Sequence, residues 1–597
     1  MKTKYYSGLA AAGMSMLMLA PVHAVRFESG SIEGSFDSSV TVGAGRRMQN
    51  PSCSIVGDAN ACGAAANTAQ WSGGDDGNLN YRKGDFFTAY IKGNHELLLK
   101  GPEGWKFMAR GAWLKDFKAD DTRRTDLSGD ARSQIVNHAE LLDLWISKDF
   151  SVGEQNGRVR FGRQVISWGE SLYFIGGISN NVLDFQKLAV PGTQLKEAFL
   201  PVSALSIASS LGNGVSGEAY IQFQHRRARV APVGSYFSAS DYYGKGRVPL
   251  SYSGTNFNVT GPDQYTASGQ RRLSDQESIN AIAGNGNFPI PIGPDAGPGK
   301  SGQFGLSLRY TPSGTDLDLG VYAANYHDQF PVINALNGGT ELQWQFLKNR
   351  RMYGATANFP LGNWAVGTEF SYRPKDAVTL SNCFAAGSPE LDVNLYGVVG
   401  LNNCPLHADS KKYQLSVTGL LQLQKHDGAH KVVLDLLGAD SASFIGEVAV
   451  TRYPNAGKRF TRNIEGTMVD QVAAAGYFIP LVQGSGGYPI AARFGTPTSW
   501  GYVMDFNWTY DGSLISGWQV TPGVTFSHAV KGDTPNYAVQ FLEGNKSANF
   551  YVLFNQNPTK WQAGINYTRY FGGKNDLVDR QYLKDRDFIG AFATYHF

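Results

Sequence analysis

Charged residues and long apolar runs are both scarce in this chain of 597 residues. Asp, Glu, Lys and Arg make up 17% of the sequence, against about 25% in an ordinary soluble domain. The formal net charge of +3 is far from that of a nucleic-acid-binding protein, so no nucleic-acid partner is expected. After the first 24 residues, no segment approaches the roughly 20 consecutive apolar residues of a transmembrane helix, which argues against a helical membrane protein. Glycine (71), phenylalanine (34), tyrosine (29) and small polar residues fill the chain instead.

Residues 1–24 have the composition of a secretory signal peptide. Lys2 and Lys4 make a positive start, residues 9–20 form a short apolar run, and 22–24 form a small-residue cleavage site. The run is too short for a retained anchor. The mature chain is therefore expected to be exported to an oxidising compartment.

The mature chain alternates apolar and polar residues in stretches of about ten, which predicts β-strands with one apolar and one polar face. In the last stretch, for example, Ile589, Ala591 and Ala593 share one face. Eighteen strands are predicted, at 30–44, 86–100, 104–115, 138–150, 157–168, 203–211, 215–226, 302–311, 315–327, 349–359, 363–373, 411–425, 440–453, 500–510, 514–529, 545–556, 560–571 and 585–597.

The predicted connections alternate between short turns and long loops, with residues 426–439 as the longest of the turns. This is the pattern of outer-membrane barrels, in which closure of the sheet leaves no backbone group unpaired in lipid. The predicted fold is a closed, all-β, antiparallel transmembrane barrel over residues 25–597, in contact with outer-membrane lipid. Tyr595 and the terminal Phe597 resemble the signal read by the bacterial barrel-assembly machinery.

Eighteen strands about 4.8 Å apart and tilted by about 40° enclose a cylinder roughly 36 Å across, which side chains cannot fill. Charges on the polar parity are expected to line this lumen, either as a solvated wall or as a transverse field that orients solutes. They are Lys106, Arg110, Arg158 and Arg160 from early strands, and Asp316, Asp318, Glu369, Glu447 and Asp505 from later ones.

The first strand begins close to the cleavage site, so no N-terminal plug domain is expected and a loop must constrict the lumen. The loop 169–202 is the candidate, because it is unusually apolar for a surface loop. The predicted gate residues are Arg163, Trp168, Glu170, Phe174, Phe185 and Phe199, with Glu170 expected to pair with Arg163. The alternatives are a mini-domain on top of the barrel, and a contribution from the loop 227–301.

Only four cysteines are present, Cys53, Cys62, Cys383 and Cys404, all in predicted long loops. Three pairings are possible, and local closure favours Cys53–Cys62 and Cys383–Cys404. No zinc-ligand spacing and no hydrolase motif is present. The sequence thus predicts neither an enzyme nor a metal or cofactor site.

One segment, Arg160-Phe-Gly-Arg-Gln-Val-Ile-Ser-Trp-Gly-Glu-Ser171, is followed by Val190-Pro-Gly192 and Leu195-Lys-Glu-Ala198. Together with Gly34-Ser-Phe-Asp37 and Asp585-Arg-Asp-Phe588, it resembles the bacterial outer-membrane family named "domain of unknown function 1302". The resemblance implies traffic of hydrophobic compounds. It also implies two partners, a periplasmic lipid-binding-like protein and an inner-membrane exporter of the resistance-nodulation type.

The function predicted from these features is passage of small hydrophobic or amphipathic molecules across the outer membrane. Two alternatives remain open, a general diffusion porin for polar solutes and a structural or adhesive surface barrel.

Overall fold

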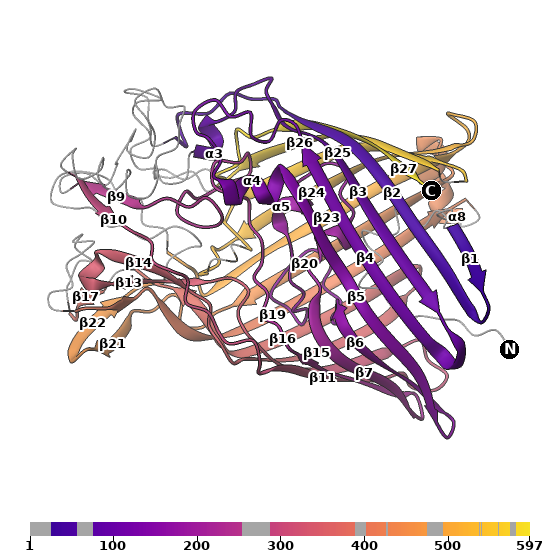
Figure 1. Cartoon of the computed structure of the whole chain (residues 1–597), viewed down its shortest axis with the longest axis horizontal. Coiled ribbons are helices and arrows are strands. Elements are labelled where there is room, and N and C mark those ends of the chain that lie inside the picture. Colours follow the sequence, from indigo (N-terminus) through magenta and orange to yellow (C-terminus); the bar gives the residue numbers. More distant parts are fainter. Residues whose placement is uncertain are drawn as a thin grey trace.

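A single barrel dominates the computed structural model of the protein, with most irregular segments gathered at one end (Figure 1). The structure describes residues 25–56, 76–253, 287–381, 383–387, 401–425, 428–473, 494–536, 538, 540–558, 560–573 and 581–597. The predicted signal peptide lies outside these residues and stays a prediction.

Eighteen antiparallel strands close the barrel, and each corresponds to a strand predicted from the alternation. They are β2 (Ile32–Arg47), β3 (Phe86–Lys100), β4 (Trp105–Asp116), β5 (Asn137–Val152), β6 (Gln155–Gln164), β7 (Val202–Gly212), β8 (Val215–Gln222), β11 (Gln303–Tyr310), β12 (Asp318–Tyr326), β15 (Arg350–Leu361), β16 (Trp364–Thr379), β19 (His407–Gln424), β20 (Ser441–Arg452), β23 (Thr498–Asp511), β24 (Trp518–Lys531), β25 (Asn545–Gln556), β26 (Trp561–Gly572) and β27 (Phe588–His596). The fold class predicted from sequence is confirmed.

The first and last strands of the ring pair with each other and close it. β27 runs antiparallel to β2 from Ser39 opposite His596 to Arg47 opposite Phe588. Ser38 and Phe597 exchange two backbone hydrogen bonds of 3.0 and 3.1 Å, so the C-terminal residue takes part in closure. A further strand, β1 (Val25–Ser29), pairs only with the start of β2.

The two faces of each strand differ as the alternation predicts. Outward residues such as Phe161, Ile221 and Val321 are more than half exposed, as expected for side chains that face lipid. Inward positions such as Glu369 and Glu447 are nearly inaccessible, at 2% and 1%. At these two positions the inner wall is therefore covered by other parts of the chain.

Long connections join the strands at one end of the barrel, which faces the cell exterior in outer-membrane proteins. They contain the small strands β9 (Leu250–Ser253), β10 (Asn287–Ile290), β13 (Val332–Leu336), β14 (Glu341–Gln345), β17 (Phe384–Ala385), β18 (Cys404–Pro405), β21 (Phe460–Ile464) and β22 (Thr467–Gln471). They also contain the helices α3 (Asp76–Leu79), α4 (Gly129–Ile135), α5 (Phe185–Leu188) and α6 (Leu195–Ala198). No helix among the described residues is long and apolar enough to cross a membrane.

The predicted Cys383–Cys404 disulfide is confirmed. It lies within an apolar cluster with Trp344 and Val469 among the long connections. Cys53 is also disulfide-bonded, but Cys62 lies outside the described residues, so the pairing of these two stays a prediction.

The structure corrects the sequence prediction at several strand ends and turns, and three of these corrections bear on the predicted residues or connections. β6 ends at Gln164 rather than at residue 168, so Trp168 belongs to the following loop. β12 begins at Asp318, which leaves Asp316 exposed in the turn before it rather than on the lumen wall. At the end of the barrel with the short turns, the longest connection contains a helix, α8 (Gly428–Leu437), where only a turn was expected. At β12 the alternation of Asp316, Leu317 and Asp318 extends beyond the residues that take part in strand pairing.

Candidate functional site

The loop between β6 and β7 is bound to the inner wall of the barrel by two buried carboxylates. Glu369 of β16 accepts backbone N–H groups from Glu170 (2.7 Å), Ser171 (3.3 Å) and Ile178 (2.7 Å). Glu447 of β20 accepts hydrogen bonds from the backbone N–H groups of residues 172 and 173 and from the Ser171 hydroxyl. These acids, predicted to line water, instead hold the first limb of the loop, residues 169–178.

Two glycines allow this close approach. A Cβ on Gly177 would lie 1.9 Å from the Glu369 carboxylate, and one on Gly169 would lie 2.3 Å from it. Gly169 also has a φ of +90°, which L side chains rarely adopt. Gly169 belongs to the Trp-Gly-Glu-Ser part of the family signature, so that motif encodes the point where the loop meets the wall.

The second limb of the loop, residues 190–199, contacts the other side of the barrel, on β3 and β4. Lys92 of β3 forms a 2.8 Å ion pair with Glu197 and donates to the carbonyl of Gly192 at 3.1 Å. Arg110 of β4 donates to the carbonyl of Lys196 at 2.8 Å. β3 and β4 are separated from β16 and β20 by many strands in both directions around the ring. The loop 169–202 therefore crosses the lumen.

The loop leaves β6 along a path that differs from the predicted one. Trp168 packs against Tyr220 and Tyr322 on the barrel wall, with ring centroids 4.9 and 5.8 Å away. Beyond it, Glu170 lies 3.6 Å from Arg309 of β11, so its predicted pairing with Arg163 is wrong. The chain has already moved along the inner wall when it reaches residue 170. Burial raises the pKa of Glu170, whereas its contacts with Asn358 and Arg309 lower it.

Apolar side chains of the loop line a cavity of about 260 Å³ at the outer end of the lumen. The lining includes four of the predicted gate residues, Trp168, Phe174, Phe185 and Phe199. Phe174 packs against Phe541, and Phe185 packs against Phe330. Apolar residues that would be a liability on a surface thus line this cavity.

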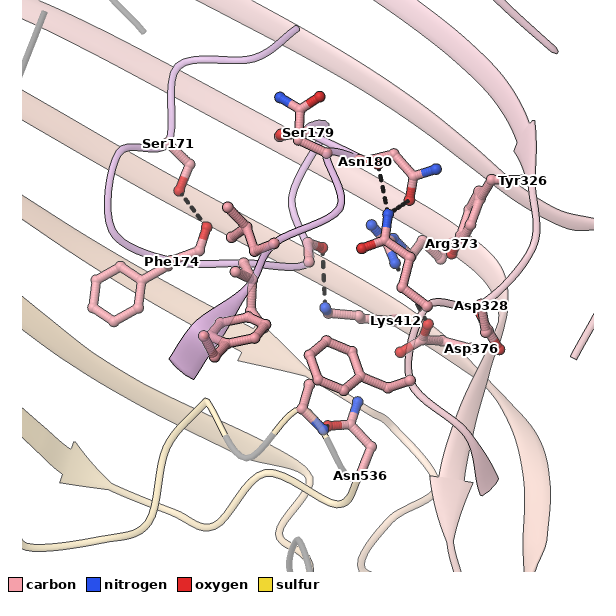
Figure 2. Close-up of a pocket in the computed structure, with 18 of the residues that line it drawn as sticks. Ser171, Phe174, Ser179, Asn180, Tyr326, Asp328, Arg373, Asp376, Lys412 and Asn536 are labelled. Carbon is pink, nitrogen blue, oxygen red and sulfur yellow. Dashed lines mark hydrogen bonds and ion pairs between the residues drawn. The ribbon is translucent and has the colours of Figure 1, made fainter. Parts of the chain in front are cut away.

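The opposite wall of the cavity is charged. Arg373 and Asp376 of β16, Lys412 of β19 and Asp328 after β12 lie on this side (Figure 2). Lys412 donates to the carbonyl of Gly176 at 3.0 Å, and Arg373 donates to that of Gly177 at 2.9 Å.

The sequence prediction named none of these four residues. Arg373 has the parity of Glu369, and Lys412 has the polar parity of its own strand. The alternation along their strands therefore predicts that both side chains face inward, but it does not show that they line the same cavity.

The other predicted lumen charges have local partners. Lys106 and Arg158 both contact Asp149 at 2.6 Å, near the short turns. Arg110 pairs with Asp143, Asp318 with Arg309 at 3.1 Å, and Asp505 accepts hydrogen bonds from Tyr551, Thr525 and Asn507. Arg160 lies over the ring of Trp145, 4.4 Å from its centroid. Among the described residues, no cluster of three or more His, Cys, Asp or Glu side chains suits a metal ion.

The family motif near the C-terminus, residues 585–588, contacts the outer loops through hydrogen bonds and an ion pair. Arg586 donates to the carbonyls of Tyr236 and Ser238 at 2.6 Å, and Asp585 pairs with the fully buried Arg47 at 3.2 Å. This motif therefore stabilises the wall of the barrel mouth and lies apart from the cavity.

Residues 6–597 match the family described as "Protein of unknown function (DUF1302)". The chain belongs to this family. The resemblance predicted from the signature is therefore confirmed over almost the whole chain. No curated protein matches the sequence.

Several solved structures show a distant similarity. The outer membrane protein OpdK from Pseudomonas aeruginosa is 9% identical, with 94% of this chain and 98% of that chain covered and a TM-score of 0.37. Acinetobacter baumannii OccAB1 is 10% identical, with 96% and 98% covered and a TM-score of 0.39. OccAB3 from the same species is 8% identical, with 94% and 99% covered and a TM-score of 0.41.

This chain's own closed ring of 18 strands with an apolar outer face places the DUF1302 protein in the outer membrane.

Proposed function

We propose that this DUF1302 protein is a gated outer-membrane channel that passes small hydrophobic or amphipathic molecules and carries out no reaction on them. The observation that carries the proposal is the apolar cavity formed by the loop that crosses the lumen. Concave, mostly apolar clefts and cavities with a few well-placed polar groups are typical ligand sites. Because the loop crosses the barrel, a cargo molecule must enter this cavity or displace the loop.

The crossing loop also favours this function over a general diffusion porin. A cylinder roughly 36 Å across would conduct freely if water filled it. Here Glu369 and Glu447 hold one limb of the loop and Lys92 holds the other. Such a lumen is selective while the loop stays in place, and the loop is the gate.

Replacing residues 172–199 with a short Gly/Ser linker tests the gate. The purified variant in planar bilayers should show a single-channel conductance several-fold above that of the intact protein. The control exchanges residues 313–315 of the short turn between β11 and β12 for Gly/Ser, which leaves the loop in place and should leave the conductance unchanged. An unchanged conductance in a correctly folded loop variant would refute gating by this loop.

A further inference from the structure

The charged wall of the cavity holds two buried cations with spare hydrogen-bonding capacity. Arg373 is 8% exposed and Lys412 is 4% exposed. Within the described residues, the single hydrogen bond of Lys412 goes to Gly176, although an ammonium group has three donors. Arg373 donates to Gly177, and its Nε is buried without a hydrogen-bond partner in the described part of the chain.

The nearby acids do not use up this capacity. Asp376 lies 3.7 Å from Arg373 and accepts a 2.7 Å hydrogen bond from Tyr453. Asp328 lies 3.3 Å from Arg350, which also pairs with Asp409. Burial raises the pKa of Asp328 to about 7, so this acid is partly protonated near neutral pH. Each of these acids therefore has another partner, and among the described residues neither accepts a hydrogen bond from Lys412 or from the Nε of Arg373.

We infer that the cavity binds amphipathic anions, with the acidic group on Lys412 and Arg373 and the apolar body against Phe174, Phe185 and Phe199. A buried cation is strongly stabilised by an ionised acceptor because its charge has lost contact with water. The inference rests on the proposed function and names its substrate class as small carboxylates or similar anions with an apolar body.

Paired probes separate this inference from the proposed function. Binding of 4-isopropylbenzoate and of its neutral counterpart 4-isopropylbenzamide would be measured calorimetrically, with the protein in lipid nanodiscs. The benzoate should bind at least tenfold more tightly than the amide. Equal binding would overturn the anion site and leave the apolar cavity intact, whereas binding of neither probe would contradict the proposed function itself.

Variants then identify the residue responsible. Lys412→Gln should remove most of the preference for the benzoate, because it should weaken binding of the benzoate far more than binding of the amide. Lys106→Gln, which removes a lumen cation near the short turns, should leave the preference unchanged. If Lys412→Gln weakened both probes equally, Lys412 would act only by holding the loop at Gly176, and its assignment to the anion site would be wrong.

A second, independent observation concerns α8, at the end of the barrel with the short turns (Figure 1). One side of α8 packs on the outer wall, where the fully buried Leu434 belongs to a cluster with Phe506 and Trp508. The side chains of Val432 and Leu436 point away from this cluster and are 71% and 86% exposed.

We propose that the exposed apolar side of α8 lies in the periplasmic leaflet of the outer membrane. The other side of α8 packs against the outward aromatic residues of β23, and Tyr510 of that strand donates to the carbonyl of Leu437 at 2.8 Å. Such aromatic side chains mark the lipid–water boundary. A short helix with Lys431 and Asp435 on its polar side suits that depth.

Environment-sensitive labels test this placement. Leu436→Cys and the control Asp435→Cys would each be labelled with nitrobenzoxadiazole in vesicles of phosphatidylethanolamine and phosphatidylglycerol. Spin-labelled lipids should quench the label at 436 several-fold more than the label at 435, and iodide should show the reverse order. Equal quenching of both labels by iodide would show that α8 lies in water and would overturn the proposal.

Discussion

The two limbs of the lumen-crossing loop are held differently, because wall cations donate to carbonyls of both limbs but the first limb is also held by wall carboxylates. On the β16–β20 side, wall carboxylates accept hydrogen bonds from five backbone N–H groups of the first limb. On the β3–β4 side, wall cations donate to carbonyls of the second limb and pair with Glu197. The first contact requires glycine in the loop, whereas the second requires an acidic side chain. We therefore expect the first limb to be bound to the barrel wall more strongly than the second.

The largest effect is expected from removing the main acceptor of the first limb. Glu369→Ala leaves three backbone N–H groups without their acceptor, at a cost of about 1–3 kcal/mol for each that stays buried. The limb should leave the wall, and single-channel conductance should rise several-fold. Asp149→Ala, an acid removed near the short turns, is the control and should not open the channel. A closed Glu369→Ala channel would mean that the other contacts hold the loop without Glu369.

A smaller change is expected from Gly177→Ala. Its methyl group would lie 1.9 Å from the Glu369 carboxylate, so either the limb or the carboxylate must move. We expect a lower thermal midpoint and more frequent opening events in bilayer recordings. Gly129→Ala, which meets nothing within 4 Å, should leave both unchanged. Normal gating in Gly177→Ala would show that the wall adapts to the added methyl group.

The second limb should respond more weakly. Lys92→Met removes the ion pair with Glu197, while Arg110 and the Tyr90 hydroxyl still donate to the limb. Hydrogen exchange should rise at residues 191–199 and stay unchanged at 170–178, with conductance raised less than twofold. Lys148→Met, which disrupts an exposed pair with Glu103, is the control. A rise in exchange at 170–178 as well would show that the two limbs move as one unit.

The smallest effect is a pH dependence of anion binding at the cavity. The pKa of Asp328 is raised to about 7 by burial and by Asp376, against the opposing effect of Arg350 and Arg373. Raising the pH through 7 ionises Asp328 and adds a negative charge, so 4-isopropylbenzoate should bind a few-fold more weakly. Calorimetry at pH 6 and pH 7 checks this, and Asp328→Asn should reduce the difference between the two. The same slope in Asp328→Asn would assign it to another group.

The sequence by itself determined the barrel. Each strand has lipid on its outer face and protein or water on its inner face, so apolar and polar residues alternate along the strand, and this alternation is visible in the local sequence. It also indicated which loop is too apolar for a surface, and the alternation marked Glu369 and Glu447 as inward-facing. The sequence did not show what these acids bind, because each lies roughly 200 or more residues from its partners in the loop.

Only the tertiary structure decided the partner of Glu170, the meeting of Arg373 and Lys412 at one cavity, and the helix on the outer wall. Alternation tells which face a residue occupies but not which strand stands across the lumen. It also cannot reveal α8, because the position of its apolar residues makes sense only against Phe506 and Trp508 of a strand about 70 residues further along the chain. The register of the strands and the closure of the barrel decide which residues meet, and both arise from pairing between segments that are distant in the sequence.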